Sequence, residues 1–159
     1  MLASDLNTVI RIEEQSFPHP WTFGQFMSEL QRESVSRCHV AVMEDHEAYP
    51  ARHTSPGTLS VVGFIMAWLA ADELHITNLA VAPEARRCGV ASALLEHSIR
   101  EAVEVGADWC QLEVKVSNTP ARGLYMRSGF KPLGIRKGYY HNGEDAVVMG
   151  RELKPEVSV

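Results

Sequence analysis

Two residues, a glutamate and a tyrosine, have side chains that can exchange protons. The secondary-structure patterns around them do not call for such groups at these positions. Glu113 stands inside an alternating run, residues 109–116, on the face opposite its apolar residues. Tyr125 follows Asn118 by seven residues, a spacing that places both on one face of a helix. A carboxylate and a phenol in these positions could act as general base and general acid. Taken alone, each is explained better by a structural role, with Glu113 paired to a cation and Tyr125 packed.

An anion-binding turn is the second candidate. The run RRCGVA, residues 86–91, lies between an expected strand and an expected helix. Gly89 lets the backbone approach a ligand, and the first turn of a helix offers N–H groups and the positive end of its dipole, which suit a pyrophosphate. The run matches neither the GxGxxG nor the GxxxxGK[ST] pattern. A plain turn with two solvated arginines would have the same sequence, so both interpretations stay open.

Composition and charge exclude several classes of protein. The chain has 159 residues, 45% of them hydrophobic and 22% charged, which predicts one soluble domain over residues 1–159. The formal net charge of −5 argues against nucleic-acid binding, which usually needs a basic patch. No apolar run reaches the roughly 20 residues of a membrane helix, and the N-terminus lacks the layout of a signal peptide. We therefore expect a cytoplasmic protein that contacts neither nucleic acid nor membrane.

The cysteines and histidines do not indicate a metal site. Cys38, Cys88 and Cys110 are an odd number without CxxC spacing. The seven histidines form no HExxH pair. We expect no disulfide framework and no metal.

Helical and strand patterns follow one another in an order typical of a mixed α/β fold. We expect Thr22 to cap the helix that begins at residue 23. We also expect a long loop at residues 44–60 and a tail at residues 154–159. The expected helices span residues 5–15, 23–32, 89–105 and 118–128. The expected strands span residues 38–43, 61–70, 73–81, 109–116, 130–136 and 146–153.

The strand expected at residues 73–81 changes phase. Leu74 and Ile76 lie at even positions, whereas Leu79 and Val81 lie at odd ones. One extra residue near Thr77 would cause this shift, so the pattern suggests a β-bulge. Burial of both faces of the strand would explain it equally well.

Together these features resemble the GNAT superfamily of acetyltransferases. Within it they are similar to the bacterial ribosomal-protein-alanine N-acetyltransferases (the RimI family), over most of the chain. The segments that carry the resemblance are FPHPW at 17–21, NLAV at 78–81, RRCGVA at 86–91, LEVK at 112–115, LYMRSGF at 124–130 and GYY at 138–140. The resemblance implies the GNAT fold, with four helices, a mixed sheet of six or seven strands, and a bulged strand (73–81) that splays from the strand at 109–116.

The resemblance also implies acetyl-CoA as cosubstrate and assigns a role to individual positions. Glu113 matches the general base of the family, and Tyr125 matches its general acid. The coenzyme would contact Leu79, Ala80, Val81, Arg86, Arg87, Cys88, Gly89, Val90, Ala91, Ser92 and Asn118. The acceptor peptide would contact Trp21, Tyr139 and Tyr140, although these aromatic residues could instead pack at a sheet edge.

Three functions remain open from the sequence. The resemblance favours transfer of an acetyl group to a protein N-terminus, in particular the N-terminal alanine of a small-subunit ribosomal protein. The same fold and cosubstrate could serve a small amine, such as a polyamine, an aminoglycoside or an amino acid. A non-catalytic acetyl-CoA sensor is the third, but the presence of both Glu113 and Tyr125 argues against it.

Overall fold

The computed structural model describes residues 1–44 and 59–153, so most of the predicted loop and the predicted tail lie outside the described residues. The helices are the short 3₁₀ turn η1 (Ala3–Asp5), α1 (Leu6–Ser16), α2 (Phe23–Leu30), the 3₁₀ turn η2 (Pro83–Ala85), α3 (Val90–Glu104) and α4 (Thr119–Arg127). The strands are β1 (Ser36–Glu44), β2 (Leu59–Ala70), β3 (Glu73–Val81), β4 (Trp109–Lys115), β5 (Lys131–Arg136) and β6 (Ala146–Glu152). Within the described residues no helix is long and apolar enough to cross a membrane.

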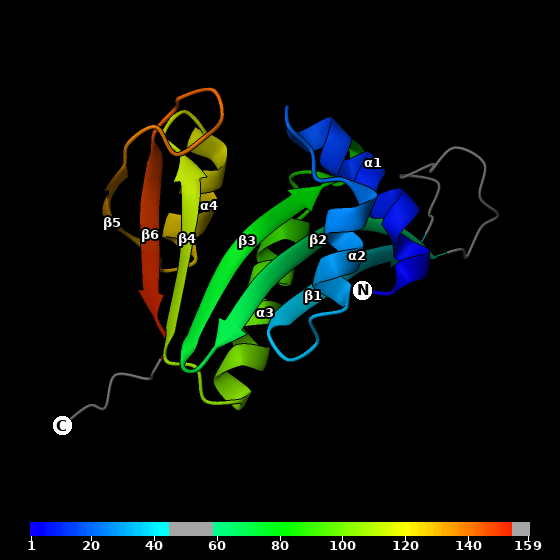
Figure 1. Ribbon diagram of the computed structural model, residues 1–159, viewed down its shortest axis with the longest axis horizontal. Coiled ribbons are helices and arrows are strands. Elements are labelled where there is room, and N and C mark those ends of the chain that lie inside the picture. The colour runs from blue at the N-terminus through cyan, green and yellow to red at the C-terminus, as the bar shows by residue number, and fades with distance from the viewer. Residues whose placement is uncertain (45–58, 154–159) are drawn as a thin grey trace. The chain divides into compact units, whose positions relative to one another are not determined.

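The strands form one mixed sheet of six, in the order β1-β2-β3-β4-β6-β5 (Figure 1). β3 pairs with β4 in parallel, and β6 is antiparallel to both β4 and β5. The predicted α/β class and four helices are therefore confirmed, and the mixed sheet, predicted to have six or seven strands, has six.

Contacts divide the chain into two compact units. The first joins Met1–Met66 with Asn78–Leu95, and the second joins Ala67–Thr77 with Glu96–Val159. The boundaries fall inside β2, β3 and α3, so both units share these elements. That residues 1–159 form a single domain stays a prediction from the sequence.

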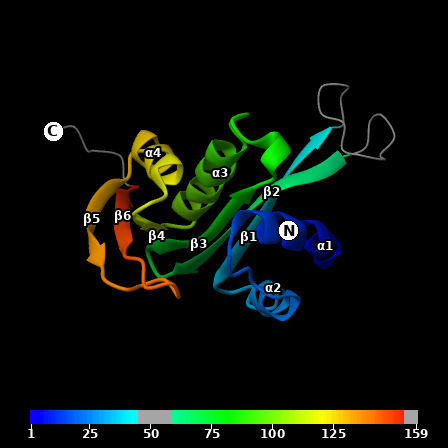
Figure 2. The same ribbon diagram turned by 90° about the horizontal axis from the view of Figure 1, so that it is seen from above.

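The first unit is built on the apolar stripe of α1. Leu6, Val9 and Ile12 recur at helical spacing, are buried, and pack in one cluster with Phe26 and Phe64. Figure 2 shows α1 and α2 on one face of β1 and β2, with the first turns of α3 on the other. The predicted cap of α2 is present as a capping box, because Thr22 and Gln25 each bond the other's backbone N–H.

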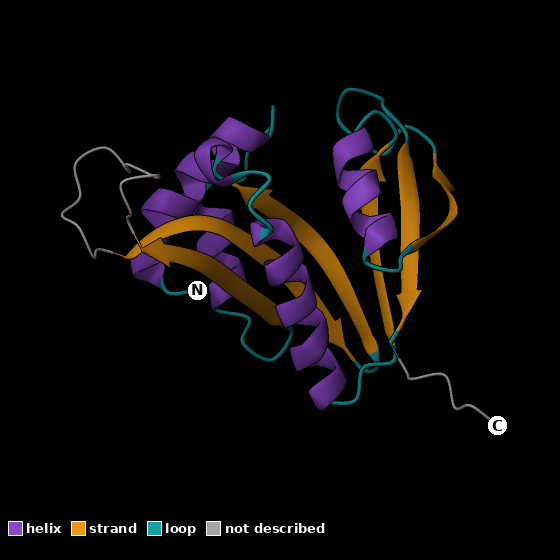
Figure 3. Cartoon of the chain, turned by 180° about the vertical axis from the view of Figure 1, so that it is seen from behind, coloured by secondary structure: helices purple, strands orange, loops and turns teal. Residues whose placement is uncertain are grey.

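The second unit is organised around β4, whose burial alternates from Trp109 to Lys115 as the sequence predicted. Seven residue pairs join β4 to β6, from Trp109↔Glu152 to Lys115↔Ala146. Helix α4 runs along one face of β4 and β6 (Figure 3). It buries the ring of Tyr125, whose centre lies 5.9 Å from that of Phe130.

The change of phase in β3 has a different origin from the one we inferred. Burial alternates without interruption from Glu73 to Ala80, and Asn78 occupies a buried position between Ile76 and Ala80. The apolar pattern breaks because a polar residue stands on the buried face, where its amide donates to the Glu13 carboxylate at 2.9 Å. The shift therefore does not itself indicate a bulge.

Gly150 of β6 is expected to tolerate no side chain. A Cβ atom there would lie 2.3 Å from Trp109 Cζ2 and 2.7 Å from Leu133 Cδ1, so the indole would have to move. We expect Gly150→Ala to lower the free energy of unfolding by about 1–3 kcal/mol, as overpacking does. Gly134→Ala on β5 is the matched control, because nothing lies within 4 Å of its Cβ position. Urea unfolding of both variants tests this, and equal stability would contradict it.

Candidate active site

In the first unit, Arg86 fixes the turn that leads into α3. Its Nε donates to the carbonyl of Val81 at 3.0 Å, and its Nη2 donates to Ser16 Oγ at 3.3 Å. The guanidinium thus ties the turn to the end of β3 and to the end of α1. The predicted contact of Arg86 with the coenzyme stays a proposal beside this structural role.

The rest of the turn has the geometry of an anion cradle. Arg87 and Gly89 both adopt left-handed backbone conformations, with φ of 67° and 81°. Nothing lies within 4 Å of the Cβ position of Gly89, so the protein leaves open space there. Gly89 comes directly before α3, whose first N–H groups have no intrahelical partner and carry the positive end of the dipole. Arg87, Cys88 and Gly89 are exposed, Val90 is buried, and Ser92 is exposed.

A buried carboxylate that the sequence analysis missed connects two predicted segments of this unit. Glu13 is 1% exposed; its Oε1 accepts from the Trp21 N–H at 3.1 Å and its Oε2 accepts from Asn78. Burial raises the pKa of Glu13, opposed by these two hydrogen bonds. Trp21 itself packs on the core, its ring centre 5.5 Å from that of Phe26. The position of Glu13 four residues after Val9, on the apolar face of α1, was the available signal.

Leu79, Ala80 and Val81 form the end of β3. Leu79 is partly exposed, whereas Ala80 and Val81 are buried. The carbonyl of Val81 already accepts from Arg86. The Ala80 carbonyl lies against Gly63, where a Cβ would come within 3.0 Å of it.

In the second unit, Glu113 is held by two basic side chains. Its Oε2 lies 2.7 Å from His75 Nε2, and its Oε1 forms an ion pair with Arg136 Nη1 at 2.9 Å. The Glu113 side chain is only 5% exposed, against 24% for His75 and 51% for Arg136. The hydrogen bond with His75, followed by the charges of His75 and Arg136, lowers the pKa of Glu113 despite its burial. Glu113 is therefore ionised at neutral pH.

His75 and Arg136 were not predicted from the sequence. His75 lies on β3, where the parallel register pairs it with Gln111, two residues before Glu113. Successive even or odd positions of neighbouring strands share a face, which brings these two side chains together. The register could not be read from the sequence, so only the polar character of His75 between Leu74 and Ile76 was visible beforehand.

Tyr125 and Asn118 occupy opposite ends of α4. Asn118 is the N-cap, and its Oδ1 accepts from the Ala121 N–H at 3.2 Å. Tyr125 is 8% exposed, and burial raises the pKa of its hydroxyl above the usual range. The phenol is accordingly protonated at any physiological pH.

The turn after β5 carries the two predicted tyrosines. Their ring centres lie 5.2 Å apart in an edge-to-face arrangement. Arg136 lies over the Tyr139 ring and Lys115 over the Tyr140 ring, at 5.7 and 5.1 Å from the centroids. Burial, followed by neighbouring charge, raises the pKa of both, that of Tyr140 to about 12. The Glu113 charge acts on both tyrosines, so the second unit brings Glu113, Tyr139 and Tyr140 into one electrostatic cluster.

Two acidic residues hold this turn in place. Glu144 Oε1 accepts from the backbone N–H and the hydroxyl of Ser117. Asp145 accepts from the Gly138 N–H at 2.9 Å and from Lys137 Nζ at 2.7 Å. The bonds from Ser117 lower the pKa of Glu144 to about 2. The turn is thus anchored to the end of β4 by a carboxylate that stays ionised.

Two of the three cysteines are buried or half-buried and supply no thiolate. None of the three forms a disulfide. Burial raises the pKa of Cys110 to about 12 and that of Cys38 to about 11, so neither supplies a thiolate at neutral pH. Cys88 is exposed in the turn before α3, where its Sγ contacts the Arg86 carbonyl at 3.5 Å.

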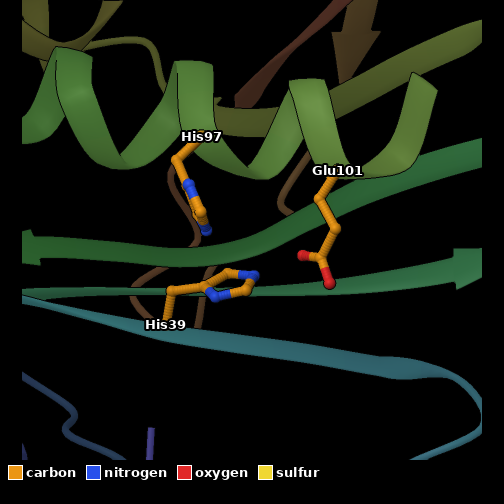
Figure 4. A group of neighbouring side chains, drawn as sticks. All are labelled: His39, His97 and Glu101. Carbon is orange, nitrogen blue, oxygen red and sulfur yellow. The ribbon is translucent and has the colours of Figure 1, made fainter. Parts of the chain in front are cut away.

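Helix α3 carries a histidine and a glutamate that are potential metal ligands and lie outside the predicted site. Figure 4 shows His97 and Glu101 on α3, one helical turn apart, together with His39 of β1. His97 and Glu101 belong to the second unit and His39 to the first. Two ligands from one helix do not complete a metal site, and we assign no metal to them.

Comparison with known proteins gives one consistent result. The family model described as the acetyltransferase (GNAT) family matches residues 6–130. A protein of Bacillus subtilis (strain 168), provisionally named as a [ribosomal protein bS18]-alanine N-acetyltransferase, is 36% identical over 150 residues, which are 94% of this chain and 90% of that protein. The N-alpha-acetyltransferase of Saccharolobus solfataricus is 32% identical over 162 residues, with coverage of 94% and 88%.

Solved structures agree with these relatives. The crystal structure of the ribosomal-protein-S18-alanine N-acetyltransferase from Escherichia coli matches with a TM-score of 0.75 and 28% identity. The match covers 100% of this chain and 95% of that one. The similarity therefore extends over the elements that carry both groups of predicted site residues.

Proposed function

The chain belongs to the acetyltransferase (GNAT) family, and on this premise we propose that it acetylates the α-amine of a protein N-terminus. The acetyl donor is acetyl-CoA, and the proposed acceptor is the N-terminal alanine of a small-subunit ribosomal protein. The observation that carries the proposal is the similarity to N-terminal acetyltransferases over nine-tenths of the chain. An acceptor of this kind would place the enzyme in the cytoplasm.

The proposed chemistry begins with removal of a proton from the acceptor amine. An α-amine has a pKa of about 7.7–8.0 and attacks a carbonyl only when neutral. Glu113, ionised and nearly buried, supplies the negative charge toward which that proton moves, directly or through an intervening group. Acetyl-CoA supplies the thioester that the neutral amine attacks, so no nucleophile of the enzyme is needed.

Tyr125 is the proposed acid. Because its raised pKa keeps the hydroxyl protonated, it can donate a hydrogen bond to sulfur as negative charge develops there. The ring is fixed by burial and by Phe130, so the position of the hydroxyl oxygen is set before substrate binds.

The turn from Arg87 to Ser92 is the proposed pyrophosphate cradle. Its two left-handed residues, the open space beside Gly89 and the N-terminus of the 15-residue α3 together fit an anion of that kind. We also propose that the rest of the coenzyme contacts Leu79, Ala80, Val81 and Asn118.

Tyr139 and Tyr140 are the proposed walls of the peptide site, so the anchor of their turn should control peptide binding. We expect Glu144→Ala to raise the KM for peptide about fivefold or more and to change kcat less than twofold. The reason is that the hydrogen bonds between Glu144 and Ser117 order the turn but do not position the reacting groups. Since the pKa of Glu144 is lowered, this anchoring is fully present above pH 4.5 and is lost as the pH falls toward about 2.

Steady-state kinetics with an alanine-initiated hexapeptide measures the effect. Glu104→Ala, an exposed carboxylate on α3, is the matched control and should leave KM unchanged. An unchanged KM for Glu144→Ala would remove the turn from the peptide site.

An acceptor panel tests the proposed function. Purified protein and acetyl-CoA are incubated with hexapeptides that differ only in their first residue, and with a polyamine and an aminoglycoside. We expect kcat/KM to be highest for alanine, by about 10-fold over a residue larger by a few methylene groups. A higher kcat/KM for either small amine would replace this function with small-amine acetylation.

A further inference from the structure

The segment between α1 and α2, residues 17–22, belongs to no helix or strand. Pro18 and Pro20 carry no backbone N–H, so this segment has few donors with which to fix its path. The N–H of the half-buried Trp21 donates to Glu13 Oε1 at 3.1 Å, eight residues back along the chain. This bond closes the segment into a loop that is held on α1.

The same carboxylate also binds β3. Its second oxygen, Oε2, accepts from the side-chain amide of Asn78 at 2.9 Å, on the buried face of the strand. One turn further along α1, Ser16 Oγ accepts from Arg86, which also donates to the Val81 carbonyl. Helix α1 is therefore joined to the end of β3 at two points, and Glu13 is the point that also holds the segment after α1.

Burial of Glu13 is costly for the folded state. The residue is 1% exposed, and both groups that donate to its oxygens are neutral. Because burial raises the pKa of Glu13, its ionisation lowers the free energy of unfolding at neutral pH, a cost that is absent below about pH 4.5. An apolar side chain would fill this position on the apolar face of α1 without that cost. What the carboxylate supplies instead is two acceptor oxygens for two separate donors.

We propose that Glu13 is a positioning residue of the acceptor site, whose two oxygens hold the segment that carries Trp21 in place against β3. Glu13 acts through this segment and not on the reacting atoms. A segment that is fixed beforehand does not have to be ordered when the peptide binds, so its loss raises the KM for peptide. The inference rests on the proposed function and on the predicted contact of Trp21 with the acceptor.

Glu13→Leu removes both acceptor oxygens and keeps a side chain of similar size. With an alanine-initiated hexapeptide, we expect the KM for peptide to rise about tenfold or more. The value of kcat and the Kd for acetyl-CoA should each stay within about threefold, since the reacting groups and the turn before α3 are unchanged. Glu14→Leu makes the same change at the exposed neighbour on α1 and should keep the wild-type KM. A wild-type KM in Glu13→Leu would overturn the proposal.

An exchange of hydrogen-bonding groups separates positioning from packing. At pH 8, Asn78→Asp sets a second carboxylate against that of Glu13 and should raise the KM as Glu13→Leu does. The double variant Glu13→Gln/Asn78→Asp restores both bonds, because the glutamine amide donates to the new carboxylate while its oxygen still accepts from Trp21. We expect the KM of this double variant to return to within about threefold of wild type.

The exchange also decides the outcome if Glu13→Leu does not fold. A high KM in Asn78→Asp that the double variant leaves uncorrected would overturn the proposal. Parallel losses of kcat, acetyl-CoA affinity and peptide affinity would overturn it too, because they indicate a purely structural role. A wild type without activity on any α-amine would instead overturn the proposed function, and this inference with it.

Discussion

Glu113→Gln is expected to lower kcat by about 100- to 1000-fold, the range for loss of a positioned acid-base group. Glutamine has nearly the same shape but no charge, and it places an NH₂ group against either His75 or Arg136. The negative charge that draws the amine proton away is lost. Because the turn before α3 is unchanged, the Kd for acetyl-CoA should remain within about twofold. Single-turnover rates and calorimetric titration measure the two effects separately.

The control for this variant is another paired glutamate of the same unit. Glu96 forms an ion pair with Arg151 at 3.0 Å but is 48% exposed, and Glu96→Gln should keep kcat within twofold. A similar kcat for wild type and Glu113→Gln would remove Glu113 from the reaction. Parallel losses of kcat and of acetyl-CoA affinity would indicate a general disturbance of the fold.

Stability gives an independent check on the same residue. The lowered pKa of Glu113 means that its stabilising contribution is present above about pH 4.5, the ordinary value, and is lost as the pH falls below it. Glu113→Gln should therefore have a lower free energy of unfolding than wild type at pH 7. This difference in stability should become smaller below about pH 4.5. Thermal unfolding at both pH values follows this change.

Gly89→Asp is expected to weaken acetyl-CoA binding by tenfold or more. Aspartate brings a negative charge to the helix N-terminus, where the dipole favours an anion of the ligand by roughly 0.3–2 kcal/mol. It also fills the open space beside the turn and must adopt a φ of 81°, which L-residues disfavour.

Asparagine separates these causes. It has the size of aspartate without the charge and tolerates left-handed backbone better than most residues. Gly89→Asn should therefore bind acetyl-CoA less well than wild type but better than Gly89→Asp. Wild-type affinity in Gly89→Asp would show that this turn does not hold the pyrophosphate.

The elements were predictable where the local pattern decides the structure. The alternation from Trp109 to Lys115 predicts β4, and Thr22 as N-cap predicts the start of α2, because both signals depend on residues close in sequence. The candidate site was only partly predictable. Glu113 stood out as a charge inside a strand, whereas its partner His75 depends on a parallel register that links residues 38 positions apart.

Two further features show the same limit. A pattern of apolar residues does not reveal a buried polar pair whose members lie 65 positions apart. The Asn78 region was therefore interpreted as a change of strand phase, and its partner Glu13 was missed. The sequence predicts that Arg86 contacts the coenzyme, which stays a prediction, but it does not reveal the contacts of this side chain within the protein. The direction of its side chain, toward Val81 and Ser16, is set by the packing of α1 beside the end of β3.

The most direct test of the account is the position of the acetyl group on one peptide. A hexapeptide that begins with alanine and contains an internal lysine offers the enzyme both an α-amine and a side-chain amine. Incubation with wild-type protein and acetyl-CoA, followed by tandem mass spectrometry, locates the added acetyl group. If the enzyme acetylates protein N-termini, a single acetyl group is found on the α-amine of alanine and none on lysine. Acetylation of lysine, or no acetylated product from protein that binds acetyl-CoA, would contradict it.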